Sequence, residues 1–188
     1  MHELICCFGA KPGAWHSDCE MAFDNTTSLR LFYALWPDEA TRIALTRLQE
    51  PLAGRKMHRQ DLHITLAFLG QQPASLLPDL QALLRQLPPP ELDLQLDRIG
   101  YFPRSRIVWA GMQSVPEALL VLHDALATML SQLGVRSVQH GCFTPHVTLA
   151  RDAPAPSESA IEAVSWHANR IVLVQSISAP EAERYRVL

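Results

Sequence analysis

The sequence predicts an α+β fold with two similar halves, arranged as a pseudo-symmetric pair of lobes with a cleft between them. Two observations lead to this prediction. Segments with strand and helix patterns follow one another in the order strand, helix, strand, helix, strands, helix and strands. In addition, the pattern His-apolar-Thr-apolar occurs at His63–Leu66 and again at His146–Leu149. We therefore expect each lobe to contribute one copy of this pattern.

Each element of the first half has its own signal. The segment 29–36 is apolar at nearly every position, as is typical of a strand covered on both faces. The Pro-Asp-Glu sequence that follows starts a helix, because acidic residues favour the positive end of a helix. The buried stripe of this helix is expected to hold Ala40, Ile43, Ala44 and Leu48. The first motif strand, 62–69, leads to a helix over 73–87 that Pro78 splits or delays.

The second half follows three consecutive prolines. Alternation of apolar and polar residues over 92–97 predicts a half-exposed strand, with 106–112 as its hairpin partner. A long helix over 116–133 is expected to end at Gly134. Its apolar stripe consists of Leu119, Leu122, Leu126, Met129 and Leu133. The remaining predicted elements are the second motif strand at 146–151, a loop at 153–159, and closing strands at 170–177 and 185–188.

The two motifs carry the chemistry. Side chains alternate between the faces of a strand, so His63 shares a face with Thr65, and His146 shares one with Thr148. Two such faces on one cleft supply two proton-transfer groups and two hydroxyl donors. This set suits acid–base catalysis on a phosphate ester without a metal. A lone histidine on a strand is more often structural, but a structural role gives no reason for the threonine to recur.

With their flanking residues, these motifs resemble the two-histidine (2H) phosphoesterases, and most closely their bacterial RNA 2′,3′-cyclic phosphodiesterase, or 2′–5′ RNA ligase-like, branch. The segments 61–70 and 145–151 carry the resemblance, and 30–35 and 104–109 support it. It implies two antiparallel-rich sheets that line a groove, with helices packed outside. We expect 29–188 to form a single bilobal domain, preceded by a flexible N-terminal extension over 1–28.

The resemblance implies metal-independent hydrolysis of RNA 2′,3′-cyclic phosphate ends to 2′-phosphomonoesters. His63 and His146 are the predicted catalytic acid–base pair, although the sequence does not tell base from acid. Thr65 and Thr148 are the predicted phosphate donors. Strict alternation turns Arg151 away from them, but the resemblance places an arginine near the phosphate, and a bulge could rotate it inward. Arg151 is therefore the third predicted substrate-binding residue.

Weaker candidates surround this set. Phe68 and Tyr33 could stack on a base, but buried packing is the preferred interpretation. Tyr185 is expected to line the cleft. Arg104 and Arg106 flank the groove or are simply exposed.

Other functions stay open. The same residues could serve 2′–5′ RNA ligation, a 2′–5′ oligonucleotide phosphodiesterase, or a non-catalytic RNA-end-binding module. A binding module needs no proton-transfer pair, which disfavours that alternative. No metal and no cofactor are expected, since the adjacent Cys6 and Cys7 have poor spacing for zinc and no cluster for a two-metal site is visible.

Composition and charge indicate the kind of partner and the compartment of this protein. A formal net charge of −3 argues against broad binding of long nucleic acid, but not against binding one RNA end. There is no run of 18 apolar residues and no secretory signal. The four cysteines fit a reducing compartment. We expect a cytoplasmic monomer that acts on RNA ends and not on membranes.

Overall fold

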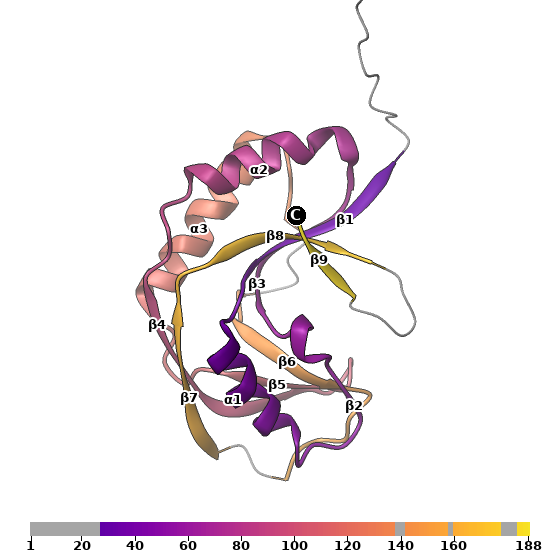
Figure 1. Cartoon of the computed structure of the whole chain (residues 1–188), viewed down its shortest axis with the longest axis vertical. Helices are drawn as coiled ribbons and strands as arrows, with labels where there is room; N and C mark the ends of the chain where they lie inside the picture. The colour runs from indigo at the N-terminus through magenta and orange to yellow at the C-terminus, as the bar shows by residue number, and fades with distance from the viewer. Residues whose placement is uncertain (1–26, 138–141, 158–159, 178–183) are drawn as a thin grey trace, which may run out of the picture.

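The computed structural model describes residues 27–137, 142–157, 160–177 and 184–188. It confirms the predicted α+β class with two lobes (Figure 1). In chain order the elements are β1 (Ser28–Leu35), α1 (Glu39–Gln49), β2 (Arg55–Lys56), η1 (Arg59–Asp61), β3 (Ile64–Pro73), η2 (Ala74–Leu76), α2 (Leu77–Gln86), β4 (Leu92–Phe102), β5 (Ile107–Gly111), α3 (Glu117–Gln132), β6 (His146–Arg151), β7 (Ala160–Ala168), β8 (Ile171–Ser176) and β9 (Tyr185–Val187). The predicted extension lies outside the described residues up to position 26, and Ser28 already belongs to β1.

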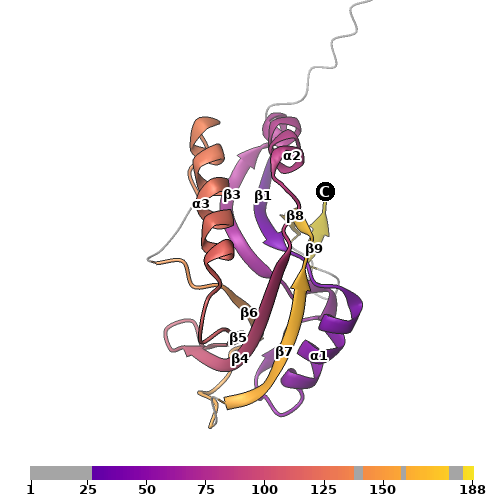
Figure 2. The same cartoon turned by 90° about the vertical axis from the view of Figure 1, so that its left-hand side faces the viewer.

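The described strands form one curved antiparallel sheet in the order β7-β4-β5-β6-β3-β1-β8-β9, with β2 paired to β6. The two sheets that the resemblance implied are therefore the two halves of one sheet, joined where β3 pairs with β6. The half with β1, β3, β8 and β9 lies above the half with β4 to β7 in Figure 1. Helix α2 packs against β8 and α3 against β3, on the outer side of the first half (Figure 2). Helix α1 packs against β6 and β7, although the chain enters it from β1. The two lobes therefore exchange segments of the chain.

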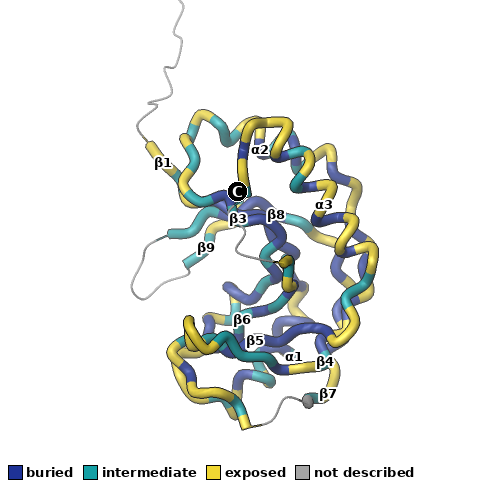
Figure 3. Tube along the Cα trace, turned by 180° about the vertical axis from the view of Figure 1, so that it is seen from behind, coloured by how far each residue is buried: buried dark blue, intermediate teal, exposed yellow. Residues whose placement is uncertain are grey.

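Strand β1 is buried on both faces from Leu31 to Leu35, as predicted, whereas Leu29 is half-buried and Arg30 is exposed. Leu31, Tyr33 and Leu35 face the main core under α2 and α3, where the Tyr33 hydroxyl donates to the Leu80 carbonyl at 2.7 Å. The opposite face of β1 joins β8 in a small apolar cluster of Phe32, Ala34, Val172 and Val174. The buried stretches of the sheet appear dark blue in Figure 3.

The predicted buried stripe of α1 is confirmed in part for Ala44 and Leu48, which are half-buried against the core, and is wrong for Ala40 and Ile43. Ala40 is exposed and Ile43 is 43% exposed. The helix instead buries a face shifted around its axis, made of Thr41, Arg42, Leu45 and Gln49. Two of these residues carry long polar side chains that are hydrogen-bonded inside the protein. A search for apolar periodicity alone misplaces such a face around the helix axis.

Strand β7 was not predicted, although its sequence alternates. Val164, Trp166 and Ala168 are buried, and Ser165 and His167 between them are exposed. The strand pairs with β4 along most of its length. Its small residues and the preceding Pro/Ser loop masked the alternation.

Other predicted details hold with small changes. In α3, Leu130 is fully buried in place of Leu133, which is 41% exposed. Gly134 ends that helix with a φ of 73°, a conformation that favours glycine. Pro78 delays the second helix, which begins after the short η2 turn. No helix among the described residues is long and apolar enough to cross a membrane.

Candidate active site

The two motifs meet where β3 pairs with β6. Ile64 lies opposite Val147 in an antiparallel register. This register sets His63 on the side of Thr148, and Thr65 on the side of His146. All four side chains line one cleft of about 510 Å³ between the halves of the sheet. The structure therefore brings together the four motif residues that the sequence placed on two separate strands.

Both imidazoles are held in the same way. The Nδ1 atom of His63 lies 2.5 Å from the carbonyl oxygen of Asp61, and Nδ1 of His146 lies 2.7 Å from that of Thr144. A carbonyl oxygen only accepts, so Nδ1 carries the hydrogen in each ring and Nε2 of the neutral ring is left as an acceptor. The Thr65 hydroxyl, 3.1 Å from Nε2 of His63, then donates to it. In both residues Nε2 is thus the ring nitrogen that the backbone leaves uncommitted, although at His63 the Thr65 hydroxyl must turn away before this atom can take part in proton transfer.

Burial shifts both imidazoles toward the neutral form. It lowers the pKa of His63 to about 4, against the opposing effect of the hydrogen bond to the Asp61 carbonyl. The positive charges of Arg151 and Arg42 and the neighbouring His146 lower it further. The pKa of His146 is lowered as well, first by burial and then by Arg151. An anion in the cleft acts in the opposite direction, because it favours the protonated ring.

Aromatic rings fix the plane of His63. Phe32 stacks on it at a centroid distance of 4.9 Å, and Trp36 stacks at 5.7 Å with only 19° between the planes. Tyr185 meets it edge-on at 5.1 Å, which agrees with the predicted place of Tyr185 in the cleft. Sequence reasoning missed Phe32 and Trp36, which lie four residues apart near the end of the strand β1 beside the motif.

His146 has its own aromatic support. Phe102 meets it edge-on at 5.1 Å, and Trp109 lies at 5.8 Å. Gly100 lies opposite Trp109 in the β4–β5 pair. A Cβ atom at Gly100 would fall 2.0 Å from the Trp109 ring. The missing side chain at Gly100 is therefore what lets Trp109 lie across β4 and support His146.

A bulge brings Arg151 into the cleft. The pairing of β6 with β5 shifts by one residue after Thr148, so that Leu149 is extra and the alternation changes phase. Arg151 consequently lines the same cavity as Thr148. Strand β3 shows the same shift after Thr65, which turns Phe68 into the cavity. The two motif strands thus have the same bulge. Three residues after its threonine, one strand carries the cation Arg151 and the other carries the aromatic ring of Phe68.

The remaining charge in the cleft is positive. Besides Arg151, its lining includes Arg30, whose guanidinium lies 5.0 Å from the centroid of the Phe68 ring, and Arg184. Carboxylate side chains are missing among the described residues of this lining. Such a cavity favours an anionic ligand.

Only some of the weaker candidates line the cleft. Tyr33 is fully buried and packs in the core, whereas Phe68 lines the cleft. Arg104 and Arg106 lie in the exposed turn between β4 and β5 and are not part of the cavity lining. Arg106 instead donates to the carbonyl of Asp152 at 3.3 Å.

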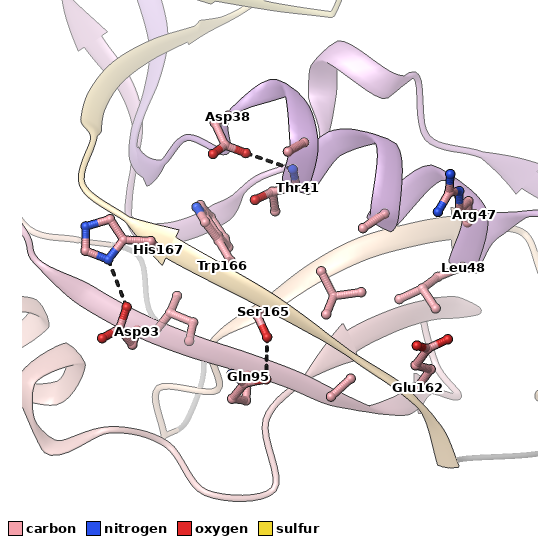
Figure 4. A pocket seen from close by; sticks show the side chains of 15 residues that line it. Asp38, Thr41, Arg47, Leu48, Asp93, Gln95, Glu162, Ser165, Trp166 and His167 are labelled. Atoms are coloured by element: carbon pink, nitrogen blue, oxygen red, sulfur yellow. Dashed lines mark hydrogen bonds and ion pairs between the residues drawn. The ribbon is translucent and has the colours of Figure 1, made fainter.

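A second hollow, of about 610 Å³, lies between α1 and the strands β4 and β7 (Figure 4). Its polar groups already serve the fold. Asp38 caps α1 by accepting from the Thr41 N–H at 2.7 Å, and His167 is bonded to Asp93 at 2.8 Å. Because the motif residues all lie in the other cavity, we place the candidate active site there.

The sequence matches the family model described as the 2′-5′ RNA ligase superfamily over residues 36–178. The chain belongs to this superfamily. The curated RNA 2′,3′-cyclic phosphodiesterase of Thermus thermophilus is 34% identical over 174 residues, covering 85% of this chain and 88% of that protein. The protein of the same name from Escherichia coli K12 is 41% identical over 109 residues. This match covers 55% of this chain and spans 58% of the E. coli protein.

Solved structures of similar fold support the same family. The E. coli protein LigT in its apo form has a TM-score of 0.75 at 30% identity, covering 87% of this chain and 96% of that one. LigT complexed with 3′-AMP has a TM-score of 0.76 at 31% identity, with 86% and 96% coverage. The comparisons confirm the predicted family and fold, and the relatives' names bear out the predicted enzyme class, a cyclic phosphodiesterase.

Proposed function

We propose that this chain hydrolyses RNA 2′,3′-cyclic phosphate ends to 2′-phosphomonoesters without a metal, using His63 and His146 as its acid–base pair. The observation that carries the proposal is the convergence of two identically oriented imidazoles on one positively charged cleft, each with a threonine beside it. The names of the relatives support the substrate class.

The reaction needs one proton taken and one given. Nε2 of one histidine accepts a proton from water, whose oxygen attacks phosphorus. The bond from phosphorus to the ribose O3′ breaks, and the other imidazolium protonates that oxygen to leave a 3′-hydroxyl and a 2′-phosphate. The Thr65 and Thr148 hydroxyls and the Arg151 guanidinium donate to the non-bridging oxygens as charge grows on them.

Substrate binding prepares the protonation state. Both imidazoles are neutral near pH 7 in the free enzyme, since burial lowers both pKa values. A cyclic phosphate between them carries a negative charge that favours one imidazolium. The two rings then titrate as a coupled pair, which gives a bell-shaped dependence of activity on pH.

The reverse reaction, 2′–5′ ligation, uses the same groups, and the superfamily's description includes it. Water attacks the cyclic phosphate in hydrolysis and a 5′-hydroxyl does so in ligation, so the product separates the two. The complete acid–base set comes from a single chain, and we propose that the enzyme acts as a monomer. Its predicted cytoplasmic location stays a prediction.

The test is turnover of a short RNA that ends in a 2′,3′-cyclic phosphate, in EDTA, by the wild type, His63→Ala and His146→Ala. We expect a single 2′-phosphate product and a loss of roughly 10²–10⁴-fold in each variant. A folded wild type that leaves this RNA intact would exclude the proposed substrate. A 3′-phosphate product would reverse the assigned leaving group.

A further inference from the structure

We propose that the buried face of α1 carries two positioning residues, Arg42 and Gln49, which set the geometry of the two motifs from behind the cleft. Helix α1 packs against β6 and β7 of one half, but follows β1 of the other half and also contacts η1. It is therefore placed to act on both motifs. The kinetic part of this inference rests on the proposed function, whereas its structural part does not.

Arg42 reaches His63 by two routes. It is only 4% exposed, and its guanidinium lies 5.2 Å from the centroid of Trp36, the ring that stacks on His63. Its Nη1 also donates to the carbonyl of Arg59 at 3.0 Å. Arg59 begins the η1 turn that ends at Asp61, whose carbonyl accepts from Nδ1 of His63. One side chain thus holds both the ring that orients the imidazole and the turn that fixes its tautomer.

Gln49 acts on the other motif. It is 3% exposed, and its Nε2 donates to the carbonyl oxygens of Leu149 at 2.8 Å and Met57 at 2.9 Å. Leu149 is the extra residue of the β6 bulge, and its carbonyl also accepts from the N–H of Met57. The bulge is what turns Arg151 into the cleft after Thr148. Gln49 therefore stabilises the backbone shape on which the position of Arg151 depends.

The two residues belong to one face of the helix. Positions seven apart lie two turns apart on the same side. A buried polar side chain costs stability unless it is hydrogen-bonded, and an apolar residue would satisfy helix packing more simply. The burial of Arg42 and Gln49 is explained when each fixes the backbone of a motif.

Variants of Arg42 test the first route. Arg42→Lys keeps the charge but loses the planar fork, and Arg42→Met keeps only the stem. We expect kcat to fall by roughly 10- to 100-fold in both, because a small misplacement of a catalytic group is costly. The Cε1–H proton NMR signal of His63 should move and that of His146 should stay.

Gln49→Leu tests the second route. We expect roughly a tenfold weaker affinity for inorganic phosphate and a similar rise in KM, through the displaced Arg151. The pKa values of both histidines should rise, because displacing Arg151 removes a positive charge that lowers them. Ile43→Ala, on the exposed side of the same helix, is the matched control and should leave all readouts unchanged.

Melting curves accompany each variant. Wild-type kcat and an unmoved His63 signal in folded Arg42→Lys would overturn the first half of the proposal, and wild-type phosphate affinity in folded Gln49→Leu the second. If Arg42→Met does not fold, Arg42→Lys decides. The NMR and phosphate-binding results stand even if the cyclic phosphate is not the substrate, so the two proposals fail separately.

Discussion

Ile64 lies opposite Val147, and through this pair β3 joins β6 and one half of the sheet joins the other. The residues on either side of the pair are the four motif residues. Their relative positions are therefore set by a backbone ladder and not by loops, which is how a site gains rigidity. The loops and helices around the ladder tune the protonation, charge and orientation of these groups.

Burial of His63 makes the free energy of unfolding depend on pH. Its pKa falls from 6.5 to about 4 on folding, so the unfolded chain binds more protons between these values. The stability is complete above pH 6.5 and is lost as pH falls toward 4, by about 3 kcal/mol in total. In His63→Gln this part of the pH dependence should vanish when urea unfolding is measured at several pH values. An unchanged slope would contradict the burial argument.

Arg151 and Phe68 occupy equivalent places after the two bulges, and only one carries charge. We expect Arg151→Met to weaken binding of inorganic phosphate by roughly 10- to 100-fold, because charge-assisted hydrogen bonds are lost. Phe68→Leu, the matched change, should alter it by less than about threefold. Isothermal titration of phosphate measures both. Equal effects would mean that the phosphate does not sit beside Arg151.

Gly100→Ala should disturb His146 from a distance. The new Cβ meets the Trp109 ring, and this ring must move from under the imidazole. We expect a loss of about 1–3 kcal/mol in unfolding free energy and a lower kcat. Gly134→Ala is the control, since its Cβ meets no atom within 4 Å and only its positive φ is strained. It should cost about 1 kcal/mol and spare activity. Normal kcat in Gly100→Ala would remove the role given to Trp109.

His167 should give the opposite pH dependence to His63. Its ring is bonded to Asp93 and Glu91, and these bonds raise its pKa, the one to Asp93 most. A raised pKa adds stability that is complete below pH 6.5 and is lost as pH rises through the folded value. His167→Gln should flatten the melting temperature above about pH 6.5 without changing turnover. A changed kcat would link the hollow of Figure 4 to catalysis.

The motif faces could be predicted because strand alternation is a local property of the backbone. Two residues of spacing were enough to place Thr65 with His63 and Thr148 with His146. From the sequence, a bulge was anticipated only as one way in which the alternation of side chains could change and turn Arg151 inward. Its equivalent at Phe68 was not, since nothing in the local sequence distinguishes a bulged strand from a regular one.

The buried face of α1 could not be predicted from local sequence. Arg42 and Gln49 are polar, and their burial is favourable only because partners distant in the sequence accept their hydrogen bonds. The aromatic supports of the histidines are also tertiary contacts. Trp109 reaches His146 through the space that Gly100 leaves, and this relation is invisible before the strands are paired.

The junction at Ile64 and Val147 also has a mechanical consequence. A rigid rotation of one half of the sheet against the other moves atoms in proportion to their distance from the axis. With the axis at this junction, the imidazoles beside it are displaced least, and the outer walls at β9 and at the β4–β5 turn are displaced most. Such a rotation would widen the cleft for a bulky ligand while the spacing of the two imidazoles is nearly conserved.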